Sequence, residues 1–231
     1  MNKLGLEKNS EEINILGRLV NASNATLFGE ILCGDDLVKV IYKPIAGERP
    51  LWDFPDGSLA FREYSAFLLS EACQFNIVPT TILRDGPFGF GMVQQWIDVD
   101  KSIDLIGFGQ SDNPQLRKLA LFDSIINNTD RKYGHLLLDT SNHLYGCDHG
   151  VSFHKEDKLR TVIWQFAGRK FTSDEIELLD RCLELDLTTM FEDFLNSDEI
   201  DSLSYRIKRL KKENCFPFPS DQWPAIPWPP V

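Results

Sequence analysis

Apolar and polar positions alternate in three short segments near the start of the chain, INILGRLV (13–20), LFGEIL (27–32) and LVKVIYKP (37–44). The GDD triplet between the last two is a strong hairpin signal, because these residues adopt tight turns. Two further segments of this type, 78–85 and 89–98, flank a DGPFG turn. We therefore predict an antiparallel sheet in the N-terminal part of the chain.

Apolar residues that recur every three or four positions predict the helices. One helix is expected at 59–74 with Ser58 as its N-cap, and a longer one at 112–128 with its cap at Asp112 or Asn113. Two short strands follow at 135–139 and 143–148, and three more helices are expected at 173–186, 187–195 and 197–213. This order predicts an α+β fold of two lobes, with the sheet and one helix in residues 1–99 and a mostly helical lobe in residues 100–213.

The end of the chain has a different composition. FPFPSDQWPAIPWPP (216–230) holds six prolines and two tryptophans, and because proline is excluded from helix interiors and central strands, the backbone should run extended. A disordered end is one interpretation. The aromatic content is too high for a solvated tail, so we expect residues 214–231 to dock on the body and bury their aromatic side chains.

Charge and hydropathy exclude several classes of protein. The 24 basic and 35 acidic residues give a net charge of −11, which repels nucleic acid and anionic membranes. No apolar run approaches the roughly 18 residues of a membrane helix, and the N-terminal MNKLGLEKNSEEIN lacks the apolar segment of a signal peptide. We predict a cytoplasmic protein with neither nucleic acid nor a membrane as a stable partner, and the oligomeric state stays open.

Four charged residues lie at positions where an apolar element would favour none. Lys43 ends the third predicted strand, Glu63 lies in the first helix, and Asp130 and Asp148 each follow an apolar segment. Each alone has an ordinary explanation, as a solvated strand end, a helix surface or a turn. In this order they match the needs of ATP phosphoryl transfer: a lysine for the phosphates, a glutamate that orients it, an aspartate for the incoming hydroxyl and an aspartate for the metal.

The surrounding motifs carry a family resemblance. VIYKP, FREYSAF, NNTDRKYGHLLL and CDHGVSF resemble the phosphatidylinositol 3- and 4-kinase superfamily, and more closely its small bacterial members, over residues 13 to about 230. The resemblance implies a two-lobed protein-kinase-like fold in which Lys43 and Glu63 bind ATP. It also implies that Asp130 is the catalytic-loop aspartate and that Asp148 is the metal-binding one.

The chain departs from the usual pattern at the phosphate loop and at one metal ligand. VNASNATLF (20–28) replaces a glycine-rich loop, so Ser23, Asn24 and Thr26 are expected to supply hydroxyl and backbone N–H groups to the phosphates. His135 stands where the superfamily has asparagine. A neutral imidazole binds manganese better than it binds magnesium, so both Mg²⁺ and Mn²⁺ are considered as the metal. Alternatively, His135 contacts phosphate as a cation, or Asn128 replaces His135 as the metal ligand.

Two further roles are expected in the cleft. Arg131 is assigned to the catalytic loop with Asp130, and Asp123, roughly two helical turns back, is a candidate partner that would fix it. The adenine is expected against MVQQWID (92–98), where the backbone of four residues can present alternating donors and acceptors: Gln94, Gln95, Trp96 and Ile97. Trp96 is expected as an apolar wall, or else as strand core.

These features predict an ATP-dependent phosphotransferase that transfers the γ-phosphate to a hydroxyl acceptor. The negative net charge and the lack of a basic amphipathic helix favour a protein or small-molecule acceptor over a lipid. His135 suggests an alternative, a non-catalytic nucleotide-binding pseudokinase that regulates a partner. AMP transfer from ATP bound in the reverse orientation is a third possibility.

Overall fold

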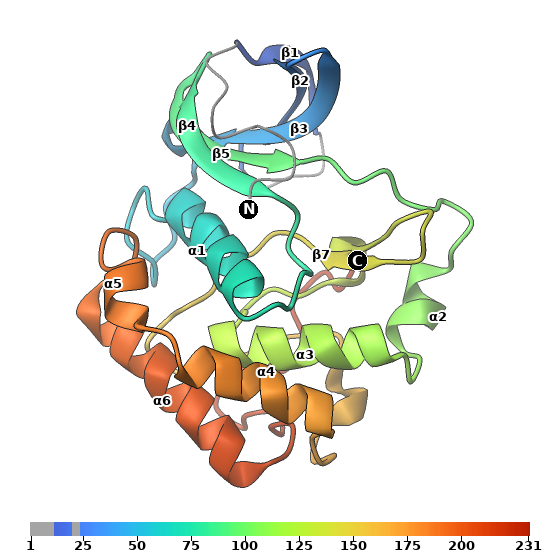
Figure 1. The fold of residues 1–231 in the computed structure, drawn as a ribbon, viewed down its shortest axis with the longest axis vertical. Helices are drawn as coiled ribbons and strands as arrows, with labels where there is room; N and C mark the ends of the chain where they lie inside the picture. The colour runs from blue at the N-terminus through green and yellow to red at the C-terminus, as the bar shows by residue number, and fades with distance from the viewer. Residues whose placement is uncertain (1–11, 20–23) are drawn as a thin grey trace.

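A five-stranded antiparallel sheet forms the upper part of the molecule (Figure 1), in a computed structural model that describes residues 12–19 and 24–231. The strand order is β1-β2-β3-β5-β4, with β1 at Asn14–Arg18, β2 at Leu27–Cys33, β3 at Asp36–Pro44, β4 at Thr81–Gly86 and β5 at Gly89–Gln95. The predicted strands are therefore confirmed, although β4 begins after Pro79 and not at Val78. Proline cannot donate to a sheet ladder, which explains the later start.

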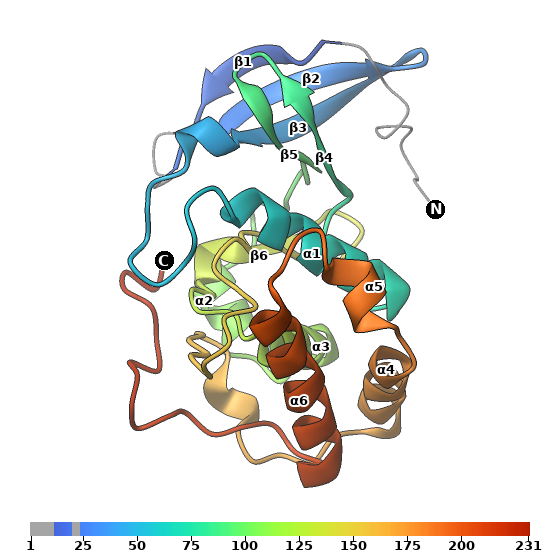
Figure 2. The same ribbon diagram turned by 90° about the vertical axis from the view of Figure 1, so that its left-hand side faces the viewer.

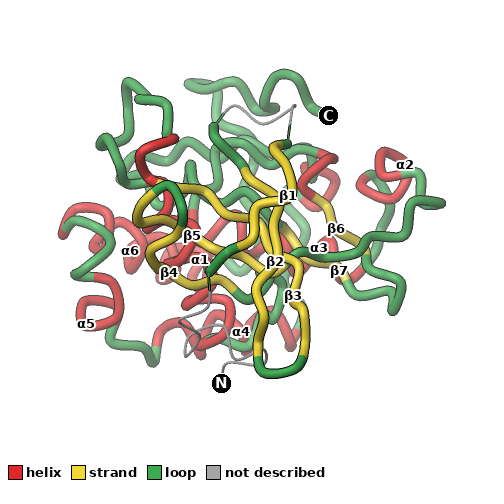
Figure 3. The backbone as a smooth tube through the Cα atoms, turned by 90° about the horizontal axis from the view of Figure 1, so that it is seen from above, coloured by secondary structure: helices red, strands yellow, loops and turns green. Residues whose placement is uncertain are grey.

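The sheet has a small core of its own, built from apolar residues that alternate along the strands: Ile13, Ile31, Val40, Tyr42, Ile82 and Val93. The turn between β2 and β3 contains Gly34, whose φ of 65° lies in the left-handed region that glycine adopts without strain. Seen from above, this hairpin extends beyond the helices (Figure 3). The sheet therefore has a hydrophobic core that is separate from the core of the helical part.

Helix α1 (Leu59–Ala72) lies beneath the sheet (Figure 1). Ser58 is the N-cap residue, as predicted, but its side chain makes no capping hydrogen bond, because the hydroxyl donates to the carbonyl of Pro55. The Glu48 carboxylate accepts the N–H groups of Leu59 and Ala60 instead, at 3.1 and 2.8 Å. A carboxylate at this end is also favoured by the helix dipole.

The lower part is mostly helical and shares one large core. Its elements are α2 (Leu105–Gly109), α3 (Pro114–Ile126), β6 (Leu136–Leu138), β7 (Leu144–Gly146), α4 (Ser173–Leu183), α5 (Leu187–Phe191) and α6 (Ser197–Glu213). Asn113, and not Asp112, caps α3 by accepting the N–H of Gln115. The helix ends at Ile126 because Asn127 adopts a left-handed conformation with φ of 55°.

A buried ion pair joins the two parts. Arg62 of α1 contacts Glu199 of α6 and donates to the carbonyl of Ser152 at 2.7 Å. Both side chains of the pair are almost inaccessible to solvent, so loss of either partner would leave a buried charge without compensation. Sheet, α1 and helical part together confirm the predicted α+β, two-lobed protein-kinase-like fold.

The tail after α6 runs up one side of the lower part towards the loop that follows β3 (Figure 2). Phe216 is only 3% exposed and packs against Phe166 and Phe171. Further along, the carbonyl of Ala225 accepts the N–H of Thr161 at 3.0 Å. The tail therefore docks on the body as expected, but Trp228 is 87% exposed, so the expected burial of this ring is not found. Backbone hydrogen bonds hold this part of the tail and leave the ring in solvent.

None of the helices in residues 12–19 and 24–231 is long and apolar enough to cross a membrane.

Candidate active site

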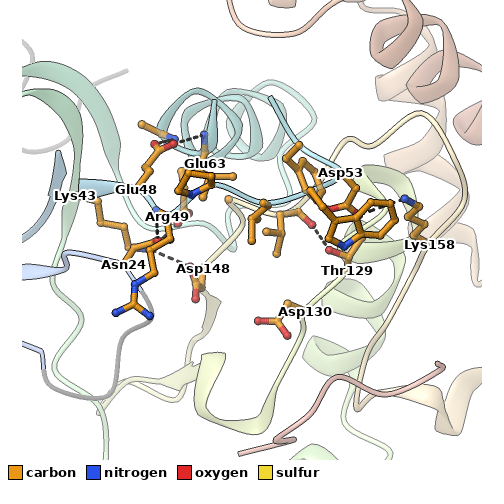
Figure 4. A pocket seen from close by; sticks show the side chains of 18 of the residues that line it. Asn24, Lys43, Glu48, Arg49, Asp53, Glu63, Thr129, Asp130, Asp148 and Lys158 are labelled. Atoms are coloured by element: carbon orange, nitrogen blue, oxygen red, sulfur yellow. Dashed lines mark hydrogen bonds and ion pairs between the residues drawn. The ribbon is translucent and has the colours of Figure 1, made fainter. Parts of the chain in front are cut away.

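Lys43 lies at the centre of a charged cluster between the sheet and the lower part (Figure 4). It is the penultimate residue of β3, and its Nζ is 2.7 Å from Glu63 Oε1 and 2.9 Å from Asp148 Oδ1. The neighbouring strand approaches closely because Gly91 has no side chain: a Cβ there would lie 2.3 Å from the Lys43 carbonyl oxygen. The structure therefore brings together three residues that are distant in the sequence.

Burial and charge act against each other in this cluster. Burial disfavours the Lys43 ammonium, but Asp148 and Glu63 outweigh it, so the pKa of Lys43 is raised. The Lys43 charge holds the pKa of Asp148 well below its ordinary value. Burial raises the pKa of Glu63, although Lys43 opposes this shift. Lys43 and Asp148 thus keep opposite charges at neutral pH, and Asp148 remains half-exposed to the cavity.

The loop that carries Asp148 packs directly on α1. The N–H of His149 donates to Glu63 Oε2 at 2.9 Å. A Cβ on Gly150 would lie 3.3 Å from the Cβ of Leu59, so this close approach favours glycine. Asp148 itself has φ of 60°, a strained conformation that the surrounding contacts maintain. The DHG motif therefore fixes the position of its aspartate relative to Glu63.

Asp130 is held by the turn that follows α3. Asn128 Oδ1 accepts the N–H of Asp130 at 3.0 Å, and Asn128 Nδ2 donates to Asp123 Oδ1 at 3.0 Å. Asn128 is fully buried by these contacts. The structure therefore contradicts its predicted role as a metal ligand and gives it a role in positioning Asp130.

Arg131 is completely buried below the cavity. Its guanidinium pairs with Asp123, with Nε 2.9 Å from Oδ2 and Nη2 2.9 Å from Oδ1, so the predicted pairing is confirmed. Nη1 donates to the carbonyl of Cys147, and Nη2 also lies 2.8 Å from His149 Nε2. Arg131 does not line the cavity, so within the loop of Asp130 it is a positioning residue, as its expected pairing with Asp123 implies.

Lys132 was not singled out by the sequence, although it lies beside Asp130. Its Nζ is 3.1 Å from Asp130 Oδ2. Burial raises the pKa of Asp130, and Lys132 opposes the shift. A signal for this contact was present in the sequence, because Lys132 is two residues after Asp130. The backbone at Lys132 is extended, and side chains two positions apart in an extended segment point to the same side.

His135 reaches the same carboxylate cluster. Its Nε2 is 3.5 Å from Asp148 Oδ2, and its Nδ1 accepts the N–H of Lys132 at 3.4 Å. Burial lowers the pKa of His135 to about 4, so the ring is neutral near pH 7 and does not suit the alternative of a phosphate-binding cation. With Nδ1 as acceptor, the proton resides on Nε2 and faces Asp148, so metal binding through Nε2 requires a change of tautomer.

The predicted phosphate loop is only partly described, since Ser23 lies outside the described residues. Asn24 lines the cavity, and its Oδ1 accepts the N–H of Arg49 at 2.8 Å. Thr26 is buried and is absent from the cavity lining. Its predicted hydroxyl contact with phosphate is therefore contradicted in this conformation.

The segment predicted to bind adenine is separate from this cavity, because Gln94, Gln95, Trp96 and Ile97 do not line it. The N–H groups of Gln95 and Trp96 already donate to Thr80 and Lys39. The side chain of Gln94 donates to Thr81 at 2.9 Å, and the ring of Trp96 packs on Phe28 with centroids 4.9 Å apart. The N–H groups of Gln95 and Trp96 are thus not available as donors, and the adenine contact stays a prediction for the other backbone groups of the segment.

The cavity has a volume of about 470 Å³ and extends from Lys43 to the tail. Its other walls include the loop after β3, the segment after the DHG motif and one tail residue: Arg49, Trp52, Asp53, Lys158, Arg160 and Trp223. The sequence reasoning missed all of these residues, because they lie in three irregular segments without periodicity. Among the described residues, no group of three or more His, Cys, Asp or Glu side chains is arranged to hold a metal ion.

The strand order, the single helix beneath the sheet and the Lys43 contacts define a two-lobed, kinase-like protein. No protein-family model matches the sequence. The chain is 37% identical over 256 aligned residues to Protein Rv2133c of Mycobacterium tuberculosis (strain ATCC 25618 / H37Rv), with 94% of this chain and 92% of that protein covered. The chain therefore belongs to the family of Protein Rv2133c, a name that states no activity.

Two solved structures have a similar chain path. One is the Helicobacter pylori proinflammatory kinase CtkA, with a TM-score of 0.49, 12% identity and coverage of 90% of this chain and 94% of that chain. The other is the golgi casein kinase, also with a TM-score of 0.49 and 12% identity, and with coverage of 92% and 75%. Neither resemblance bears on substrate or activity.

Proposed function

We propose that the protein is an ATP-dependent phosphotransferase that transfers the γ-phosphate to a hydroxyl acceptor. The observation that supports this most is the contact of Lys43 with both Glu63 and Asp148, in a cavity that Asp130 also lines. A lysine fixed by a helix glutamate, with two aspartates nearby, is the arrangement that kinase-type phosphoryl transfer uses. Membership of the phosphatidylinositol 3- and 4-kinase superfamily and a cytoplasmic location belong to the same proposal.

Each residue then has a defined role. Lys43 holds the phosphates of ATP, and Glu63 holds Lys43. Asp148 binds Mg²⁺ or Mn²⁺, since a half-exposed carboxylate is the hard oxygen ligand that these ions accept; the metal supplies positive charge for the transferring phosphoryl group. Asp130 accepts the proton of the acceptor hydroxyl, and Lys132 beside it stabilises the charge that develops on the phosphoryl oxygens.

The test is ADP formation by the purified protein with ATP and either Mg²⁺ or Mn²⁺, compared between the parent and Asp130→Asn. Asp130→Asn is expected to retain ATP affinity and to lose turnover. Equal turnover in the two proteins would remove Asp130 from the mechanism.

His135 supports a second candidate function, a nucleotide-binding pseudokinase. The imidazole occupies the position beside Asp148 and holds its proton towards that carboxylate, so one metal ligand of active kinases is replaced. ATP binding without turnover under either metal would favour this function. Mass spectrometry separates the remaining outcomes: phosphoryl transfer adds about 80 Da to the acceptor, and AMP transfer adds about 329 Da.

A further inference from the structure

The cavity continues past Asp130 into a region that the proposed roles leave unused. Its walls there are Lys158 and Arg160 from the segment after the DHG motif, Trp52 from the loop after β3, and Trp223 from the tail. Figure 4 shows Lys158 and Asp53 on the side of the cavity away from Lys43. This region lies next to Asp130, where an acceptor hydroxyl must enter if the proposed function holds.

Arg160 is the cation of this region that lacks a compensating carboxylate. Lys158 contacts Asp53 and Glu156, both at 3.2 Å. Among the described residues, no carboxylate lies within ion-pair distance of Arg160. The Arg160 Nε is buried without a hydrogen-bond partner, and the Nη2 lies 3.5 Å from the carbonyl oxygen of Ile226. Its charge is close enough to lower the pKa of Asp130, against the larger effect of burial. Since Arg160 lines the cavity, its uncompensated positive charge favours an anionic ligand there.

The backbone beside Arg160 is closed to an extended peptide. The N–H groups of Arg160 and Val162 donate to Asn128 and Arg131 of the loop that carries Asp130. The N–H of Thr161 donates in the opposite direction, to Ala225 of the tail. A peptide substrate that adds to a strand edge needs free backbone donors and acceptors, and here the chain's own tail has taken them.

The aromatic walls suit a compact ligand. Trp223 and Trp52 lie on Lys158, with its Nζ 4.5 and 4.9 Å from their ring centroids. Trp52 is 84% exposed, so most of its surface is available for stacking. The whole cavity, including the part around Lys43, has a volume of about 470 Å³, so the region beyond Asp130 has room only for a small molecule.

From these observations we propose that the acceptor is a small, water-soluble phosphomonoester with a free hydroxyl group. This inference rests on the proposed function. Arg160 binds the phosphate of the acceptor, because a guanidinium fits a phosphate through two parallel hydrogen bonds. The acceptor hydroxyl oxygen then forms a bond to the γ-phosphorus of ATP, the bond from that phosphorus to the β–γ bridging oxygen breaks, Asp130 takes the hydroxyl proton, and ADP leaves.

The binding test does not depend on turnover. Trp52 and Trp223 line the region, so ribose 5-phosphate is expected to change tryptophan emission on titration, whereas ribose is not. Arg160→Gln should weaken this binding at least about tenfold, the effect of losing hydrogen bonds to a charged group. Lys208→Gln, which removes an exposed lysine of α6, should leave it unchanged. Equal binding by the parent and Arg160→Gln, or no binding by the parent up to about 10 mM, would overturn the site.

The transfer test identifies the class of acceptor. The protein is incubated with ATP labelled on the γ-phosphate and with bacterial extract separated into small molecules, protein and lipid. The label is expected in a small molecule that binds an anion exchanger, with less label from Arg160→Gln at unchanged ATP affinity. Label found only in protein or only in lipid would refute the inference and retain the proposed function. Absence of label from every fraction would refute the proposed function, and the binding test then decides the phosphate site by itself.

Discussion

Arg131 Nη2 lies 2.8 Å from His149 Nε2, which links the loop of Asp130 to the loop of Asp148 through two completely buried side chains. Since a guanidinium only donates, His149 Nε2 accepts and its proton is on Nδ1. The backbone N–H of His149 meanwhile donates to Glu63. One continuous chain of contacts therefore runs from the loop of Asp130 to α1, and the charged groups of the cavity share a common support.

Arg131→Met should destabilise the protein strongly, because it leaves Asp123 buried without its partner. Removal of one member of a buried ion pair typically lowers the free energy of unfolding by about 3–5 kcal/mol, which corresponds to a decrease in melting temperature of the order of 10 °C for a chain of this size. Arg169→Met is the control, since its pair with Asp112 is exposed and contributes little. Similar melting temperatures for the two variants would contradict a supporting role for Arg131.

Lys43→Ala should abolish or greatly weaken ATP binding measured by calorimetry, because it removes the phosphate-binding cation. Lys39→Ala provides a matched control on the same strand: Lys39 pairs with exposed Asp98 outside the cavity, so ATP affinity should not change. If both variants bind ATP as the parent does, the nucleotide site has been placed in the wrong cavity.

Asp130→Asn should bind ATP normally and lose transfer by a factor of about 10²–10⁴, since a general base acts on the chemical step. The amide keeps the size of the side chain, and the N–H of residue 130 can still donate to Asn128. Single-turnover measurements of phosphoryl transfer at saturating ATP test this directly. A similar loss of ATP affinity and of rate would indicate a role in nucleotide binding.

Lys132→Ala should move the acid limb of the pH–rate profile to higher pH. Activity requires ionised Asp130, so it is lost as the pH falls through the pKa of that carboxyl group. Burial already raises this pKa, and Lys132 opposes the shift; without Lys132 the pKa rises further, and activity disappears earlier on acidification. The profile of kcat between about pH 4 and 8 checks the direction. An acid limb unchanged or displaced to lower pH would assign the limb to another group.

Truncation after Glu213 should lower the melting temperature, mainly through loss of the Phe216 contacts. Phe216→Ala alone is expected to reduce the free energy of unfolding by about 3–5 kcal/mol, the range for deletion of a buried aromatic side chain. Trp228→Ala should have almost no effect, because the ring is largely exposed. Denaturant titration of the three variants measures this order, and a truncated protein with the parental stability would mean that the tail is not held in solution.

The sequence by itself determined most of the regular elements and four charged residues of the site. The periods of two and about 3.6 are local properties of strands and helices, so they predicted the five strands, α1 and α3 without knowledge of packing. Lys43, Glu63, Asp130 and Asp148 could be selected because each interrupts an apolar segment, and their order matches a known chemistry. The pair of Arg131 and Asp123 could also be predicted, since Asp123 lies in α3 and Arg131 in the turn that follows this helix.

Only the tertiary structure decided which polar groups meet across the chain. The Glu48 carboxylate accepts the first N–H groups of α1, which the Ser58 side chain does not. Asn128 accepts the N–H of Asp130, and the N–H groups of Gln95 and Trp96 donate to Thr80 and Lys39. Arg160, Lys158 and Trp223 reach the cavity from irregular segments. The physical reason is that a hydrogen bond or ion pair depends on distance in space, and for residues separated by a hundred positions that distance is set by packing of the core and leaves no periodic trace in the sequence.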